Sequence, residues 1–226
     1  MRICSVNFNI PHTQHGGGGV TSFSAIEGFL KNGHEVVVLV ITGKESDNLK
    51  YKEVLELLGA KVIFLNINVD TKSLSILKYL QLSIFPKFAD IFPSIQYKEQ
   101  VKKKIDEIEP DRIFTYHWDS AVTLLDIDKY KKIVAVGDPI HLPIIFRRSL
   151  YQRLEHQIDF KRKIYYKLTD IFWEKKQIQG MVDILNNFDI KGAFAAHHAK
   201  ELESYGVKDC RYFHTPVPET DRQQDY

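Results

Sequence analysis

Four consecutive glycines, Gly16 to Gly19, stand between a short apolar segment and an amphipathic one. Because glycine has no side chain, a glycine loop can take positive φ and approach a ligand closely, and the free N–H groups of a following helix attract anions. Such a loop fits a chain in which a strand, a turn and a helix follow one another. It predicts an α/β unit that meets an anionic or bulky ligand.

The segments around this loop alternate between strand and helix patterns. Arg2–Phe8 is an apolar run typical of a buried strand. Apolar residues at helical spacing then predict a helix that is capped at its start by Thr21, Ser22 or Ser24 and at its end by Gly33. Glu27 is placed to complete a capping box from Ser24. Val36–Ile41 is apolar throughout, which is typical of a parallel strand covered on both faces.

The alternation continues to the end of the chain. A helix carrying Val54, Leu55 and Leu58 and closed by Gly59 is followed by a strand at Lys61–Ile67. Further strands are expected at Arg112–Tyr116, Lys132–Val136, Gly192–His198 and Arg211–His214, and further helices at 95–109 and 200–205. This order predicts an α/β fold with a doubly wound, Rossmann-like, mostly parallel sheet and helices on both faces. Ligands of such sheets bind beyond the carboxyl ends of the strands.

Two segments allow two interpretations each. The apolar insertion at 71–94 is either a buried helix and loop, which is the simpler interpretation, or an apolar lip that touches an acceptor or a membrane. The segment 144–176 is rich in aromatic and basic residues. The simpler interpretation is a surface helix pair over the sheet, and the alternative is a basic amphipathic face on anionic lipid.

Composition excludes several classes of protein. The formal net charge of +2 gives no reason to expect a nucleic-acid partner, and 44% hydrophobic residues exclude a disordered chain. Cys4 and Cys210 form neither a disulfide framework nor a metal motif, so a reducing cytosol is the simplest compartment. No run reaches the roughly 18 apolar residues of a membrane span, and no signal sequence is evident.

The sequence lacks the motifs of several well-known classes of binding and catalytic site. The glycine run does not match the dinucleotide fingerprint, because the third glycine and the carboxylate after the second strand are missing. Neither a P-loop nor a Gly-x-Ser-x-Gly elbow is present. His197 and His198, if on a strand, point to opposite faces and cannot share one metal ion. His12 and His15 flank the glycine loop, where they either hydrogen-bond a phosphate or sugar hydroxyl or face water.

The chain resembles the N-terminal domain of retaining glycosyltransferases with the GT-B fold, a family 4-like group (glycosyl transferases group 1) that includes sucrose-phosphate synthases and bacterial mannosyltransferases. The resemblance spans nearly the whole chain, and the glycine loop together with the Gly33–Val36 turn carries it most strongly. The motifs are the glycine loop, Asn32-Gly33-His34-Glu35-Val36, Glu109–His117, Lys200–Val207 and Thr215–Pro218.

The resemblance implies roles for particular residues. It makes 1–218 the acceptor-side domain and 219–226 a truncated linker to a missing C-terminal GT-B domain that holds most of the nucleotide sugar. Gly16, Gly17, Gly18 and Gly19, with His15 beside them, would lie under the donor diphosphate and transferred sugar. His117, the candidate catalytic residue, would sit near the sugar hydroxyls or the reacting centre. Asp138 falls where the family often has a His-Asp pair, although Gly137 replaces the histidine.

The implied activity is transfer of a sugar, with retention, from a nucleotide sugar to a glycan or lipid-linked acceptor in surface polysaccharide biosynthesis. No metal or other cofactor is expected, and a cytoplasmic location with peripheral contact at the inner face of the membrane fits this activity. The isolated chain is expected to be inactive. Two alternatives stay open, namely a stand-alone binding or regulatory module and an unrelated enzyme that uses the glycine loop for another phosphorylated ligand.

Overall fold

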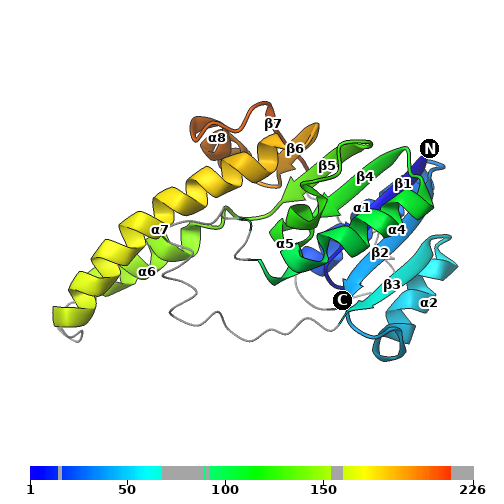
Figure 1. Cartoon of the computed structure of the whole chain (residues 1–226), viewed down its shortest axis with the longest axis horizontal. Coiled ribbons are helices and arrows are strands. Elements are labelled where there is room, and N and C mark those ends of the chain that lie inside the picture. Colours follow the sequence, from blue (N-terminus) through cyan, green and yellow to red (C-terminus); the bar gives the residue numbers. More distant parts are fainter. Residues whose placement is uncertain (15–16, 68–88, 90–91, 154–159, 215–226) are drawn as a thin grey trace, which may run out of the picture.

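The computed structural model describes residues 1–14, 17–67, 89, 92–153 and 160–214. Within them, seven parallel strands form one sheet in the order β3-β2-β1-β4-β5-β6-β7 (Figure 1). The strands are β1 (Arg2–Asn7), β2 (Glu35–Thr42), β3 (Lys61–Ile67), β4 (Arg112–Tyr116), β5 (Lys131–Val136), β6 (Ile190–Ala193) and β7 (Cys210–Tyr212). This order confirms the predicted α/β, doubly wound sheet of Rossmann type.

The two halves of the sheet meet between β1 and β4. The chain runs outward from β1 through β2 to β3, then crosses back so that Ile3 of β1 pairs with Arg112 of β4. Helices at the reversal leave the sheet on opposite faces, which opens a crevice at the carboxyl ends of the two strands. The fold therefore places its natural ligand site between the loops after β1 and β4.

The first face of the sheet is covered over β1 to β3 by α1 (Gly17–Lys31) and α2 (Leu49–Leu57). Phe23 and Ile26 of α1 and Leu55 of α2 form one core cluster with alternate residues of β2 and β3. Over β4 to β6 the same face carries a cavity of about 810 Å³, lined mainly by apolar side chains, among them Phe114 and Phe194. The described helices thus cover this face chiefly at its β1–β3 half.

The opposite face carries the larger core cluster. Val37, Leu39 and Ile41 of β2 point into it, because successive strand residues alternate between the two faces. The elements packed there are α4 (Lys98–Ile108), α5 (Trp118–Ala121), α8 (Ala196–Ser204) and the end of α7 (Phe160–Asn186). The short 3₁₀ helices are η1 (Glu45–Asn48), η3 (Pro93–Tyr97) and η4 (Val122–Leu124). Helices on both faces are therefore confirmed.

The described parts of the segment 144–176, which are 144–153 and 160–176, are helical, but they do not lie over the sheet. Figure 1 shows α6 (Leu142–Arg153) and α7 side by side, projecting beyond the sheet as an arm. Only the carboxyl end of α7, with Met181, Ile184 and Leu185, enters the core. The simpler interpretation, a surface helix pair over the sheet, is therefore wrong for the greater part of both helices. Phe146 is instead largely exposed.

Two local predictions were wrong. α1 begins at Gly17, inside the glycine run, so Thr21, Ser22 and Ser24 lie in the helix and do not cap it. His197 and His198 belong to α8, because β6 ends at Ala193 and the helix begins at Ala196. In the region of α2, Leu55 is buried, whereas Val54 and Leu58 are exposed.

Other expectations fall partly outside the described residues. Most of the insertion at 71–94 and all of the linker at 219–226 lie there. The described helices include none that is both long and apolar enough to cross a membrane.

Candidate functional site

A cavity of about 300 Å³ lies at the reversal between β1 and β4. Its walls come from the segment after β1, the start of α1 and the segment after β4. The lining residues used below are Asn7, His12, Gly18, Gly19, Ser22, Tyr116, His117, Asp119 and Ser120. The cavity thus occupies the position at which doubly wound sheets bind their ligands.

The start of α1 can approach the neighbouring segments because it consists of glycines. A Cβ atom at Gly18 would lie 3.0 Å from Cε1 of Tyr116, and one at Gly19 would lie 3.2 Å from the carbonyl oxygen of His12. Both distances are shorter than ordinary van der Waals contacts. The glycines therefore serve the packing of the helix start, and they also leave its main chain open to the cavity.

A buried hydrogen-bond chain fixes α1 to β1 at this point. Ser22 Oγ donates to Asn7 Oδ1, and Asn7 Nδ2 donates to the carbonyl oxygen of Ser5 at 3.0 Å. Asn7 and Ser22 are both buried. Because each polar group is satisfied by a partner, the cavity floor is held in one arrangement.

His117 has a strained backbone. Its φ of 77° and ψ of 157° fall in a region that residues with a Cβ seldom adopt. The backbone N–H of His117 donates to the carbonyl oxygen of Ala135, and its carbonyl oxygen accepts from Ala121. The ring Nδ1 lies 3.1 Å from Asp119 Oδ2, so the carboxylate orients the imidazole. The neighbouring elements thus hold a conformation that aims a half-exposed histidine at the cavity.

Ser120 adds a polar group that has no partner. Its side chain is fully buried and lines the cavity, and its Oγ makes no hydrogen bond within the described part of the chain. Buried hydroxyls are normally paired, so an orphan hydroxyl beside a cavity points to a ligand group that would complete it. Tyr116 stands next to this site, and burial, followed by the negative charge of Asp138, raises the pKa of its phenol.

The positive potential in the cavity comes from main-chain groups. Among the described residues that line it, none is a lysine or arginine. The positive end of α1 and the free N–H groups of its first turn supply the attraction for an anion. An anionic ligand would therefore be bound weakly unless cations came from elsewhere.

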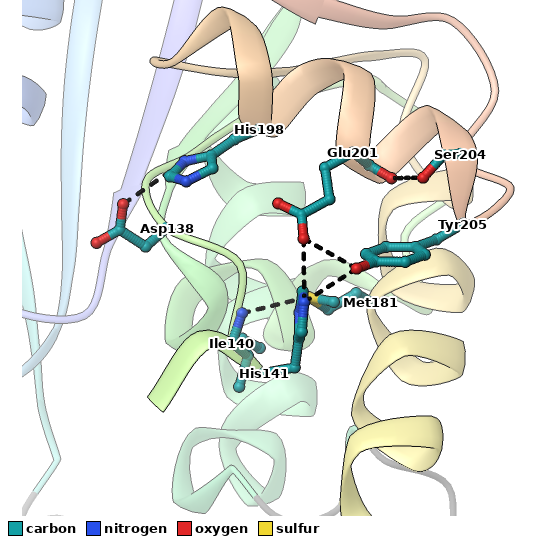
Figure 2. Close-up of polar contacts among 8 residues, drawn as sticks. All are labelled: Asp138, Ile140, His141, Met181, His198, Glu201, Ser204 and Tyr205. Atoms are coloured by element: carbon teal, nitrogen blue, oxygen red, sulfur yellow. Dashed lines mark hydrogen bonds and ion pairs between the residues drawn. The ribbon is translucent and has the colours of Figure 1, made fainter. Parts of the chain in front are cut away.

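A second polar cluster lies beside this cavity, at the carboxyl ends of β5 and β6. Figure 2 shows His198 of α8 facing Asp138, with Nδ1 3.6 Å from Oδ1. Burial and the neighbouring His197 lower the pKa of His198, and Asp138 acts in the opposite direction. Trp118 Nε1 donates to the carbonyl oxygen of Asp138 at 3.4 Å, which links the two regions.

Deeper in this cluster, His141 joins α8 to the start of the arm. Figure 2 shows Glu201 and Tyr205 converging on Nε2 of His141, each at 3.2 Å. Tyr205 also donates to Glu201 Oε1 at 2.9 Å, and burial followed by this hydrogen bond raises the pKa of Tyr205 to about 12. His141 is fully buried, and its Nδ1 has no partner among the described residues.

Loss of Glu201 should loosen this junction. We expect Glu201→Ala to lower the free energy of unfolding by about 2 kcal/mol, because a buried histidine then loses a charged acceptor. Glu201→Gln keeps an acceptor oxygen and should lose less. Chemical denaturation measures both, with Glu203→Ala on the exposed side of the same helix as the control. An equal loss in the Glu201 and Glu203 alanine variants would contradict a structural role for the cluster.

The structure brings together only some of the residues singled out from the sequence. Gly18, Gly19 and His117 line one cavity, and Gly17 begins the same helix. His15 and Gly16 lie outside the described residues. Asp138 is 83% exposed and faces His198, so it belongs to the second cluster and not to the cavity.

Sequence reasoning missed Asn7, Tyr116 and Ser120. The signal that could have identified them is their position at the carboxyl ends of the strands on either side of the reversal. Gly137 packs closely against this site, because a Cβ atom there would lie 3.1 Å from the Tyr116 hydroxyl. A side chain at that position would require the tyrosine hydroxyl to move by a few tenths of an ångström. No group of three metal-ligating side chains suited to an ion occurs among the described residues.

Comparison with known proteins supports the fold. No family model and no curated protein matches the sequence. Among solved structures, Arabidopsis thaliana UGT89C1 complexed with UDP-L-rhamnose matches 99% of this chain and 54% of that chain, at 13% identity and a TM-score of 0.51. This chain therefore spans about half the length of that structure.

Two other solved structures match less well. The Candida albicans trehalose-6-phosphate phosphatase N-terminal domain is 15% identical, with 92% of this chain and 43% of that chain covered and a TM-score of 0.44. CalG4, the calicheamicin glycosyltransferase, is 10% identical, with 75% and 42% covered and a TM-score of 0.37. The likeness to UGT89C1 in its rhamnose complex thus carries the comparison, and at this identity it concerns the fold.

Proposed function

We propose that this chain is the N-terminal, acceptor-side domain of a glycosyltransferase that moves a sugar from a nucleotide sugar to a glycan or lipid-linked acceptor. The observation that carries the proposal is the cavity at the β1–β4 reversal, where the open main chain of Gly18 and Gly19, the imidazole of His117 and the orphan hydroxyl of Ser120 converge. The similarity in fold to a protein solved with UDP-L-rhamnose supports it.

The chemistry of sugar transfer suits this cavity. As the bond from the sugar to the diphosphate breaks, positive charge develops on the sugar ring and negative charge on the departing diphosphate. Main-chain N–H groups at the start of α1 can stabilise the anion, and His117 can hydrogen-bond sugar hydroxyls or the reacting oxygen. Ser120 can pair with a further hydroxyl. Retention of configuration, without a metal or other cofactor, is part of the proposal.

The wider proposal concerns the rest of the enzyme. A cavity without lysine or arginine among its described lining residues needs cations from elsewhere to hold a diphosphate. We assign them to a C-terminal GT-B domain, so that 1–218 is one lobe and the tail after it a linker. Surface polysaccharide assembly at the cytoplasmic side of a membrane is the setting that we propose.

Binding of nucleotide sugars to this chain tests the proposal. Titration of nucleoside diphosphate sugars, followed by amide chemical shifts, should show weak binding, with Kd of about 1 mM, and shifts centred on Gly18, Gly19 and His117. Gly18→Val should abolish the shifts, because its side chain would collide with Tyr116 and fill the cavity mouth.

Two further variants make the result decisive. Ser120→Ala leaves the helix start unchanged and should weaken binding by about fivefold, since one ligand hydrogen bond is lost. Gly28→Ala lies farther along α1 with nothing within 4 Å of its Cβ, and binding should not change. Shifts confined to other regions would contradict the proposed site. Rapid sugar transfer by residues 1–226 alone would contradict the assignment of this chain as half of the enzyme.

A further inference from the structure

The outer side of α6 presents an apolar stripe to solvent. Exposed apolar residues recur at helical spacing at Pro143, Phe146 and Leu150, which we call the α6 stripe, and the exposed Arg153 continues the same face. Phe146 is 69% exposed and Leu150 is 53% exposed. Large apolar side chains aligned on one face are unusual on a surface that meets only water, whereas single exposed ones are common.

The stripe does not belong to the packing of the arm. Ile144, which is buried, lies on the other side of α6. Arg148 of α6 donates to Glu174 of α7 at 2.6 Å and so fixes the two helices to each other. The arm is therefore held together by a different face, and the α6 stripe is left to contact a partner.

The charge around the stripe is of one sign. α6 contains three arginines and no aspartate or glutamate, with the sequence Leu-Pro-Ile-Ile-Phe-Arg-Arg-Ser-Leu-Tyr-Gln-Arg. α7, which returns alongside it, opens with Phe-Lys-Arg-Lys. Nine lysines and arginines face four acidic residues between 142 and 176, although the whole chain has a net charge of only +2. Positive charge is thus concentrated on the arm.

An apolar stripe on a basic helix matches the chemistry of an anionic bilayer. The apolar side chains enter the boundary between headgroups and acyl chains, and the arginines attract the phosphates. A second copy of this chain would have to offer an acidic apolar groove, whereas the lining of its apolar cavity of about 810 Å³ contains no aspartate or glutamate among the described residues. Figure 1 shows the arm projecting beyond the sheet, so it can reach a surface without covering the β1–β4 cavity.

From these observations we propose that α6 docks the chain on anionic membranes through the α6 stripe. This inference uses no residue of the cavity and holds independently of sugar transfer. It selects the lipid interpretation of the basic aromatic segment, because the structure exposes Phe146 and Leu150 where a helix pair over the sheet would have buried them.

Vesicle flotation of the 226-residue chain tests the proposal. We expect the chain to float with phosphatidylcholine vesicles that contain phosphatidylglycerol and to stay behind with phosphatidylcholine alone. The double variant Phe146→Gln, Leu150→Gln should reduce partition by about tenfold or more, because the inserted apolar area is lost. Arg153→Gln should reduce it by about fivefold, and added salt should weaken the binding of every form.

The matched control is Leu57→Gln at the end of α2, where the side chain is 87% exposed but the helix carries both signs of charge. This variant should float like the parent chain. Binding that is absent, or that Leu57→Gln and the stripe variants weaken equally, overturns the proposal. So does a dimer that Phe146→Gln dissociates, since the stripe would then join two copies of the chain. Nucleotide-sugar titration of the stripe variants should be unchanged, which separates this test from that of the cavity.

Discussion

Gly192→Ala should lower the free energy of unfolding by about 3 kcal/mol, a large part of the stability of a domain of this size. A Cβ atom at this position in β6 would lie 2.6 Å from the carbonyl oxygen of Arg211 and 2.7 Å from the ring of Phe213. The first of these is backbone in the neighbouring strand β7, so no side-chain rotation can relieve the contact. The two strands would have to separate. Chemical denaturation with circular dichroism measures the loss.

The same substitution elsewhere in the chain supplies the control. Gly28→Ala lies within α1, where a new Cβ has nothing within 4 Å. Alanine favours a helix over glycine by about 1 kcal/mol, so this variant should gain stability. Two Gly→Ala changes of opposite sign would show that β6 and β7 approach as closely as described. An equal effect at both positions would disprove that approach.

The expected loss also shows what the sequence can and cannot predict. Val36–Ile41 is a buried strand as predicted, because a continuous apolar run between loops has few other stable solutions. Lys61–Ile67 is a strand as predicted, and at the edge of the sheet it is only partly buried. Val101, Ile105 and Ile108 of α4 are buried as their spacing predicted. Such signals are local, and the parallel order of the sheet follows from them through the handedness of crossovers.

The misses come from interactions between distant residues. Propensity placed the start of α1 after the glycines, but contacts with Tyr116 and His12 make the glycines part of the helix. A surface helix pair over the sheet was the simpler interpretation of the arm, with a lipid-binding face as the alternative. No local signal in the sequence distinguishes a buried aromatic side chain from an exposed one, so the exposure of Phe146 became evident only from the fold.

The candidate site was predictable from the sequence only where its residues form a local motif. The glycine run and His117 stood out as motifs, and Gly18, Gly19 and His117 line the cavity. Ser120 carries no motif, and it becomes informative only because its buried hydroxyl has no partner among the described residues. Asp138 was predicted to bind donor or acceptor, yet the strand it follows is one position farther from the reversal than the strand before His117.

His117→Gly should be more stable than His117→Ala, and it should lack activity. The φ of 77° at this residue costs a side chain about 1 kcal/mol or more, and glycine adopts the conformation freely. We therefore expect His117→Gly to be about 1 kcal/mol more stable than His117→Ala, because both lack the imidazole and only alanine keeps the strain. Thermal unfolding of the two variants side by side measures this difference.

Sugar transfer should fall in both variants. In the two-domain enzyme that we propose, either variant should lower kcat by about 100-fold, since the group facing the reacting sugar is lost. His117→Gln, which keeps a hydrogen-bonding side chain, should recover part of the rate. A stable protein with little activity would identify the strained backbone as a cost of positioning the imidazole. Full activity in His117→Gly would instead mean that the strain serves only the turn between β4 and α5, and His117 would lose its proposed place at the reacting centre.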